Sequence, residues 1–147
     1  MIKYSAMLEF AIRCASIAHT GQFDKGGKPY ILHPLAVMHK LNTGDYELMA
    51  IAVLHDVIED TPTTYADLRA GGLSERIIKG VTAMTKAKGD TYDEYRSKVM
   101  VNPDAVKVKM ADLEHNSDLR RLKGVTEKDV ARVAKYMKFY DELKGCL

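Results

Sequence analysis

The 147-residue sequence has few cysteines, few aromatic residues, no long apolar run and little net charge. Its two cysteines, Cys14 and Cys146, are too far apart for the spacing of zinc ligands, and we expect free thiols in a reducing compartment. No apolar segment reaches the roughly 20 residues that a membrane-spanning helix needs. Aromatic residues make up 7% of the chain and the net charge is +2, which argues against nucleic acid or a membrane surface as a partner.

The remaining composition is typical of a globular domain. Hydrophobic residues make up 46% of the chain and charged residues 29%, and this length suffices to bury one core. No linker or internal repeat divides the sequence, so we expect a single domain over residues 1–147. The N-terminus lacks the basic start, apolar stretch and cleavage site of a signal peptide, which predicts a cytoplasmic protein. The oligomeric state stays open.

Apolar residues recur three and four positions apart along almost the whole chain, as in amphipathic helices. Loops such as "TGQFDKGGKP" separate the helical segments, and Thr63, Ser74 and Thr126 are suited to cap helices. The alternating "AVKVKM" resembles a strand, but it runs without a break into a helical stretch behind Pro103. We therefore expect a compact all-α fold of seven or eight helices, over residues 4–19, 34–41, 46–60, 63–70, 74–86, 92–101, 103–122 and 126–143.

The segment "LHDVIED", residues 54–60, carries four ionisable groups in an otherwise apolar stretch. Buried charges are costly unless they are paired or bind a metal. On a continuous helix His55 would stand over Glu59, and Asp56 over Asp60, because residues four apart share a face. A solvated helix end explains Glu59 and Asp60 but not His55 and Asp56. The pattern therefore favours a functional site.

Two further candidate positions lie elsewhere in the chain. In "KMADLEHN", Asp112, His115 and Asn116 share a helix face, with Lys109 one turn earlier, and His33 lies in "YILHP" just before the helix that Pro34 is expected to start. Each alone is more often structural than functional. Together, imidazoles and carboxylates from three helices can enclose one divalent metal, and such mixed ligation suits Mn²⁺, Fe²⁺ or Zn²⁺.

With these motifs in place, the chain resembles the HD-domain metal phosphohydrolases. "HTGQFDKGGKPYILHP", "AVLHDVIEDT" and "VKMADLEHN" follow the motifs of that family in order and with similar spacing. The closest likeness is to the (p)ppGpp hydrolase domain of RelA/SpoT-type proteins and its small stand-alone relatives. The resemblance covers residues 19–122, and the helix over 126–143 is expected to be a packing element.

The resemblance implies a role for each matching residue. The ligands of one divalent metal, with Mn²⁺ favoured over Fe²⁺ and Zn²⁺, fall on His33, His55, Asp56 and Asp112. The acidic pair that acts on the attacking water falls on Glu59 and Asp60. Asn116 matches a substrate-contacting asparagine, and Lys25 matches a basic loop residue near the nucleotide phosphates. Lys109, together with Arg120 or Arg121, is expected to offset phosphate charge, whereas His19 and His115 are expected to support the site without binding the metal.

The chain departs from the family pattern around the base of the nucleotide. Asp24 stands where the alarmone hydrolases usually carry an arginine that stacks on guanine, and an acid cannot supply that contact. Leu113 also stands where an arginine is typical, and "NSDLRRL" stands where the usual pattern is "NMRTL". We expect a metal-dependent hydrolase of a nucleotide, with the 3′-pyrophosphate of (p)ppGpp the favoured substrate. The alternatives are a nucleoside monophosphate, an NADPH-type phosphate or a cyclic nucleotide, or a non-catalytic nucleotide-binding module.

Overall fold

The computed structural model describes residues 2–147. Over these residues the chain forms nine α-helices and one 3₁₀-helix, and no strand beyond an isolated bridge between Phe23 and Pro29. The predicted all-α fold is confirmed. The elements are α1 Ile2–Ala18, α2 Leu32–Lys40, α3 Tyr46–Leu54, α4 Val57–Asp60, α5 Tyr65–Ala70, α6 Glu75–Met84, α7 Tyr92–Met100, α8 Pro103–Asn116, η1 Leu119–Arg121 and α9 Glu127–Lys144.

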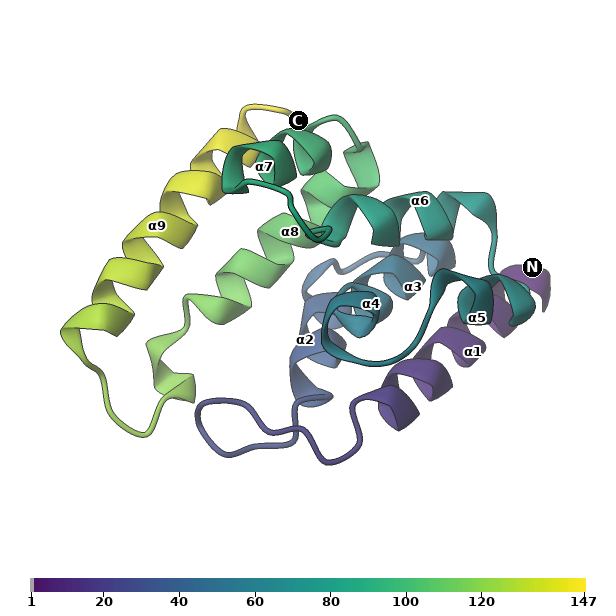
Figure 1. Ribbon diagram of the computed structural model, residues 1–147, viewed down its shortest axis with the longest axis horizontal. Helices are drawn as coiled ribbons and strands as arrows, with labels where there is room; N and C mark the ends of the chain where they lie inside the picture. The colour runs from purple at the N-terminus through teal and green to yellow at the C-terminus, as the bar shows by residue number, and fades with distance from the viewer. Residues whose placement is uncertain (1) are drawn as a thin grey trace.

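The central element is α3, which packs against α1, α2, α6 and α8 (Figure 1). Its sequence is apolar on every side, and residues 50–54 are fully buried, as expected for a helix surrounded by protein. The contact with α6 depends on Gly80, because a Cβ there would lie 2.4 Å from Ile51 Cδ1. The core is therefore built around one short helix whose end, at Leu54, leads directly into the "HD" dipeptide.

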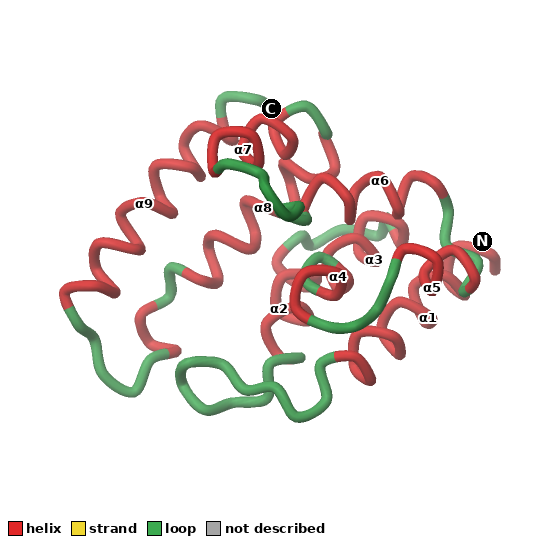
Figure 2. The backbone as a smooth tube through the Cα atoms, viewed as in Figure 1, coloured by secondary structure: helices red, strands yellow, loops and turns green. Residues whose placement is uncertain are grey.

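The remaining helices frame the molecule. In Figure 1, α8 and α9 lie side by side at the left, and α1 lies at the right against the core. The long loop between α1 and α2 runs along the lower edge and reaches the segment that joins α8 to α9 (Figure 2). This arrangement brings the loop before α2 next to the end of α8.

Most helix starts are fixed by side-chain caps, as the sequence predicts. Ser74 accepts a hydrogen bond from the Ile77 N–H at the start of α6, and Thr126 accepts one from Asp129 at the start of α9. The predicted cap of α5 was wrong by one residue. Thr64, rather than Thr63, forms a capping box with Asp67, because the box needs an acidic residue three positions after the cap.

The start of α2 also differs from the prediction. The helix begins at Leu32, so Pro34 is its third residue and His33 lies inside it. Pro34 is tolerated there because the first N–H groups of a helix have no partner within it. The structure therefore places His33, which is 2% exposed, on a rigid helix that faces the core.

The expected single helix over residues 46–60 was wrong, because the chain breaks at His55 and Asp56. The Ala52 carbonyl accepts hydrogen bonds from the His55 ring at 2.6 Å and from its backbone N–H, which ends α3. Asp56 has φ −105° and ψ −1°, in the region between helix and strand that active-site residues often occupy. The His55 ring thereby lies 3.3 Å from Asp112 of α8 and 3.0 Å from the Asp56 carboxylate, so the expected stacking of His55 over Glu59 and of Asp56 over Asp60 on one continuous helix does not form.

Two expectations about the chain as a whole can be compared with the structure. Cys14 is half-buried and Cys146 is exposed, and both are free thiols as predicted. Among the helices of the described residues, none combines the length and apolarity required to cross a membrane.

Candidate metal centre and adjoining cavity

Two histidines and two aspartates from three parts of the chain meet beside α3. His33 comes from α2, His55 and Asp56 from the break between α3 and α4, and Asp112 from α8. His33 Nε2 lies 2.8 Å from Asp112 Oδ1, and His55 Nε2 lies 3.3 Å from the same oxygen. Asp56 Oδ2 lies 3.0 Å from His55 Nε2 and 3.9 Å from His33 Nε2. The four predicted ligands are thus brought together.

The donor set fits a divalent metal. His33, His55 and Asp112 form a buried group whose ligand atoms all lie within 4.8 Å of one another. Two donors that bind one ion at about 2.1 Å are roughly 3.0–3.4 Å apart for octahedral to tetrahedral angles. His55 Nε2 is buried and has no hydrogen-bond partner among the described residues, although two carboxylate oxygens are close. An ion between these atoms would satisfy that nitrogen.

Neighbouring groups orient both imidazoles for this role. The His55 Nδ1–H donates to the Ala52 carbonyl, which leaves Nε2 as the ligand atom. His33 Nδ1 lies 2.7 Å from His115 Nδ1. Burial and the nearby Arg121 guanidinium lower the pKa of His115 to about 4, so its neutral ring can accept a hydrogen bond from the His33 Nδ1–H. Such outer contacts are typical of metal-binding histidines.

The cluster is strongly charged when no ion balances it. Burial lowers the pKa of His55, but the Asp56 and Asp112 carboxylates raise it by more than burial lowers it. The pKa of His55 is therefore well above its usual value. Burial raises the pKa of Asp56, yet the His55 imidazole outweighs this and brings it to about 2. The carboxylates therefore stay ionised at neutral pH, as metal ligands must.

Lys109 is held against a ligand of the cluster. Its Nζ donates to Asp112 Oδ2 at 2.9 Å and lies 5.3 Å from the centre of the Tyr95 ring. Burial lowers the pKa of Lys109, but the Asp112 carboxylate raises it above the usual value. Lys109 thus serves as an internal partner of Asp112. Its predicted contact with substrate phosphate stays a prediction.

The predicted acidic pair lies in α4 and its two members have different surroundings. Glu59 Oε1 accepts the backbone N–H of Lys86 at 2.6 Å, just beyond the end of α6. Burial, followed by the neighbouring Asp56 carboxylate, raises the pKa of Asp60 to about 6. A carboxyl group with that pKa can take up and release a proton near neutral pH. Asp60 is therefore the better placed of the two to act as a base.

A cavity of about 250 Å³ adjoins the cluster. Tyr30 and Asn116 belong to both, because they line the cavity and also bond to the cluster. The Tyr30 hydroxyl donates a short hydrogen bond to Asp56 Oδ2, and the Asn116 amide donates to Asp112 Oδ1 at 2.9 Å. A ligand that fills the cavity therefore lies next to the two carboxylates. Tyr30 had not been identified from the sequence, where it appears only as an apolar residue of the "YILHP" motif.

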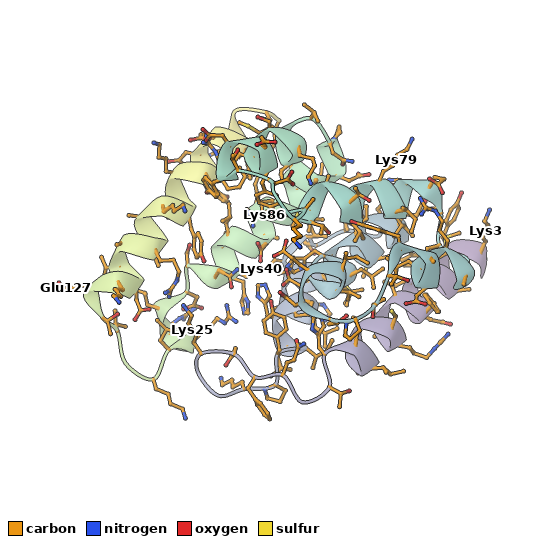
Figure 3. All side chains as sticks on the ribbon, in the orientation of Figure 1. Lys3, Lys25, Lys40, Lys79, Lys86 and Glu127 are labelled. Carbon is orange, nitrogen blue, oxygen red and sulfur yellow. The ribbon has the colours of Figure 1, made fainter. Side chains whose placement is uncertain are left out.

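The loop before α2 supplies one wall of the cavity. Lys25, labelled in Figure 3, lies on this loop beside the far end of α8 and lines the cavity. Lys25 forms no ion pair with a residue that the structure describes. The lining also includes Arg121 of η1, together with Arg132 and Tyr136 of α9. The acidic residues Asp24 and Asp118 belong to the lining as well, so basic, acidic and aromatic side chains together surround the cavity.

The fold and the ligand cluster define an HD-type helical metal centre, and comparison with known proteins agrees. The chain has the fold of a solved metazoan ortholog of SpoT, a protein that hydrolyses ppGpp. The TM-score is 0.75 at 24% sequence identity, over 99% of this chain and 88% of that chain. At that identity the likeness concerns the fold alone. No family model matches the chain.

Two curated relatives are more similar in sequence. The bifunctional (p)ppGpp synthase/hydrolase SpoT of Escherichia coli K12 is 38% identical over 121 residues, which cover 74% of this chain and 17% of that protein. The guanosine-3′,5′-bis(diphosphate) 3′-pyrophosphohydrolase of Haemophilus influenzae is 37% identical over 131 residues, 80% of this chain and 19% of that protein. The predicted resemblance to SpoT-type hydrolases is therefore confirmed. The chain spans about one fifth of the length of these relatives.

Proposed function

We propose that this chain is a divalent-metal-dependent hydrolase that removes the 3′-pyrophosphate of (p)ppGpp. The observation that carries the proposal is the meeting of His33, His55, Asp56 and Asp112 beside a cavity whose lining includes Lys25, a residue without an ion-pair partner among the described residues. The names of the two curated relatives support this substrate. We further propose that residues 1–147 form one HD phosphohydrolase domain that works in the cytoplasm.

The proposed metal site consists of the four clustered side chains. His33 and His55 would bind through Nε2, and Asp56 and Asp112 through the carboxylate oxygens that face them. We propose Mn²⁺ as the ion, with Fe²⁺ and Zn²⁺ as alternatives, since mixed nitrogen and oxygen ligands accept all three. When bound, such an ion makes water more acidic and polarises a phosphoryl oxygen.

The chain's own residues would provide the remaining chemistry. Asp60, with a pKa of about 6, takes the proton of the attacking water at neutral pH, and Glu59 assists in orienting that water. The water oxygen bonds to phosphorus, the bond from that phosphorus to the 3′ oxygen breaks, and the nucleoside oxygen is protonated. The products are pyrophosphate and the nucleotide without its 3′ group.

Substrate contacts are assigned to residues of the cavity. Lys25 would offset phosphate charge, since no neighbouring carboxylate among the described residues neutralises it. Asn116 would contact the nucleotide while holding Asp112 at 2.9 Å. Lys109, which holds the second oxygen of Asp112 at 2.9 Å, is proposed to offset phosphate charge as well.

A substrate screen tests the proposal. The Mn²⁺-loaded protein is incubated with ppGpp, common nucleoside phosphates, a cyclic nucleotide and NADPH, and phosphate and pyrophosphate release are followed. We expect pyrophosphate release from ppGpp to be the fastest reaction. Efficient turnover of another compound with none of ppGpp would retain the hydrolase class and refute the substrate. Absence of all turnover, with nucleotide still bound, would favour the non-catalytic module.

A further inference from the structure

A salt bridge crosses the cavity wall between the loop before α2 and η1. Asp24 Oδ2 lies 3.6 Å from Arg121 Nη2, and the side chains are 13% and 21% exposed. The backbones approach closely as well, since a Cβ on Gly26 would lie 2.1 Å from the Arg121 carbonyl oxygen. Asp24 is itself fixed, because its Oδ1 accepts the Lys28 N–H at 2.8 Å. The Asp24–Arg121 pair is therefore a rigid part of the wall.

The guanidinium of Arg121 is held in a defined orientation. Its Nη1 donates to the His115 carbonyl at 3.0 Å and to Asn116 Oδ1 at 3.1 Å. Nη2 is too far from Asp24 for a hydrogen bond. The Nε–Nη2 edge, which carries two parallel N–H groups, makes no hydrogen bond to any residue that the structure describes. Apart from the ion pair of Nη2 with Asp24, this two-pronged donor is available on a side chain that lines the cavity.

The chemistry of the pair favours a neutral acceptor over a phosphate. Asp24 offsets most of the positive charge of Arg121, which weakens its attraction for an anion. Guanine presents two adjacent acceptors, O6 and N7, that match such an edge, whereas adenine has an amino donor in place of O6. Phe23, at the rim of the cavity, is 66% exposed and offers a flat apolar face against which a base can stack.

We propose that Arg121, oriented by Asp24, selects guanine by donating from Nε and Nη2 to O6 and N7. The inference rests on the proposed function, since the pyrophosphate of the same nucleotide must then lie at the metal cluster. Asn116 links the proposed base-binding residue to the metal cluster, because it accepts a hydrogen bond from Arg121 at 3.1 Å and donates one to Asp112 at 2.9 Å. Asp24, where an arginine was expected, thus positions a guanidinium supplied by η1.

The test compares the guanosine and adenosine 3′,5′-bis(diphosphates) as substrates of the Mn²⁺-loaded protein. We expect wild type to prefer the guanosine compound in kcat/KM by at least ~10-fold, the scale of one bidentate base contact. Arg121→Lys keeps the positive charge but loses the two parallel N–H groups of the Nε–Nη2 edge. It should raise KM for the guanosine compound by about tenfold more than KM for the adenosine compound, so that the base preference of wild type is lost.

Arg120→Lys is the matched control. Arg120 is the preceding residue of η1, its side chain is 90% exposed and it pairs with Asp118, so both substrates should be turned over as by wild type. Metal content and melting temperature are measured for each variant to establish that the fold is intact. Equal decreases in kcat/KM for both substrates in Arg121→Lys would overturn the inference, and so would the absence of a base preference in wild type. Either result would leave the hydrolase proposal in place.

Binding of GDP and ADP by equilibrium dialysis separates the two proposals. If neither bis(diphosphate) is hydrolysed, the proposed function fails, and base selection is then decided by binding alone. GDP bound at least ~10-fold more tightly than ADP, with the difference lost in Arg121→Lys and kept in Arg120→Lys, supports the inference. Equal affinity of wild type for GDP and ADP overturns it.

Discussion

His33 and His115, 82 residues apart in the sequence, face each other with their Nδ1 atoms 2.7 Å apart. One nitrogen must donate and the other accept. Burial and the Arg121 guanidinium lower the pKa of His115 to about 4, so His115 is neutral at physiological pH and can accept. His33 Nδ1–H is then the donor in this contact, which leaves Nε2, 2.8 Å from Asp112 Oδ1, as the atom that would bind the proposed ion.

Replacement of His115 therefore tests how the site is oriented. His115→Phe keeps a ring against His33 but removes the acceptor, and we expect metal affinity to fall by ~10–100-fold. His39→Phe is the control, because His39 is an exposed residue of the same helix as His33. Affinity is measured by competition with a chromophoric chelator. Equal affinities in wild type and His115→Phe would show that the contact does not orient His33.

Lys109→Met tests whether Lys109 stabilises the cluster from within. Removal of one partner of a buried ion pair leaves Asp112 Oδ2 without its donor, and we expect a loss of about 3–5 kcal/mol in the stability of the metal-free protein. Added Mn²⁺ should recover part of it, since the ion supplies the missing positive charge. Lys107→Met, at an exposed position of the same helix, should change stability little. Urea denaturation measures both variants, and equal stabilities would contradict the assignment.

The double variant Glu59→Gln with Asp60→Asn separates catalysis from metal binding. Both changes keep volume and polarity, and a glutamine at 59 can still accept the Lys86 N–H. We expect metal content to stay at the wild-type level while turnover of ppGpp falls by at least ~10²-fold, the usual cost of losing general acid–base help. Undiminished turnover would mean that these carboxylates take no part in the reaction.

Metal binding should release a proton. In the metal-free protein the Asp56 and Asp112 carboxylates outweigh burial and raise the pKa of His55, so the ring is charged at neutral pH. An ion on Nε2 must displace that proton, and the apparent metal affinity therefore rises with pH and falls as pH is lowered. Calorimetric titration with Mn²⁺ in two buffers of different ionisation enthalpy measures the released protons. Identical heats in both buffers would refute the protonated state.

Much of the fold was predictable because it depends on local signals. Periodic apolar residues located every long helix, and Ser74 and Thr126 marked helix starts that the structure confirms. The break at His55 and Asp56 was not predictable, since the apolar pattern continues through it. At the break the His55 ring bonds to the Ala52 carbonyl and lies 3.3 Å from Asp112, which belongs to another helix and is near His55 only in the folded chain.

The candidate site, like the fold, was only partly predictable from the sequence. The candidate ligands were recognisable because each belongs to a motif with characteristic spacing, and the fold brings them together. Tyr30, the orienting contact of His115 and the unused edge of Arg121 were not recognisable. Each acts through a partner far away in the sequence, such as Asp56 for Tyr30 and Asp24 for Arg121. No local pattern encodes such pairings.

Stoichiometric activation by metal tests the central proposal most directly. Metal-free protein is titrated with Mn²⁺ while pyrophosphate release from ppGpp is followed, alongside the Asp56→Ala variant. We expect activity to rise linearly and to level off at about one ion per chain, the capacity of a single cluster of ligands, and to be absent in Asp56→Ala at every concentration. Hydrolysis of ppGpp by the metal-free protein, or full activation of Asp56→Ala at the same ratio, would contradict the proposed metal centre.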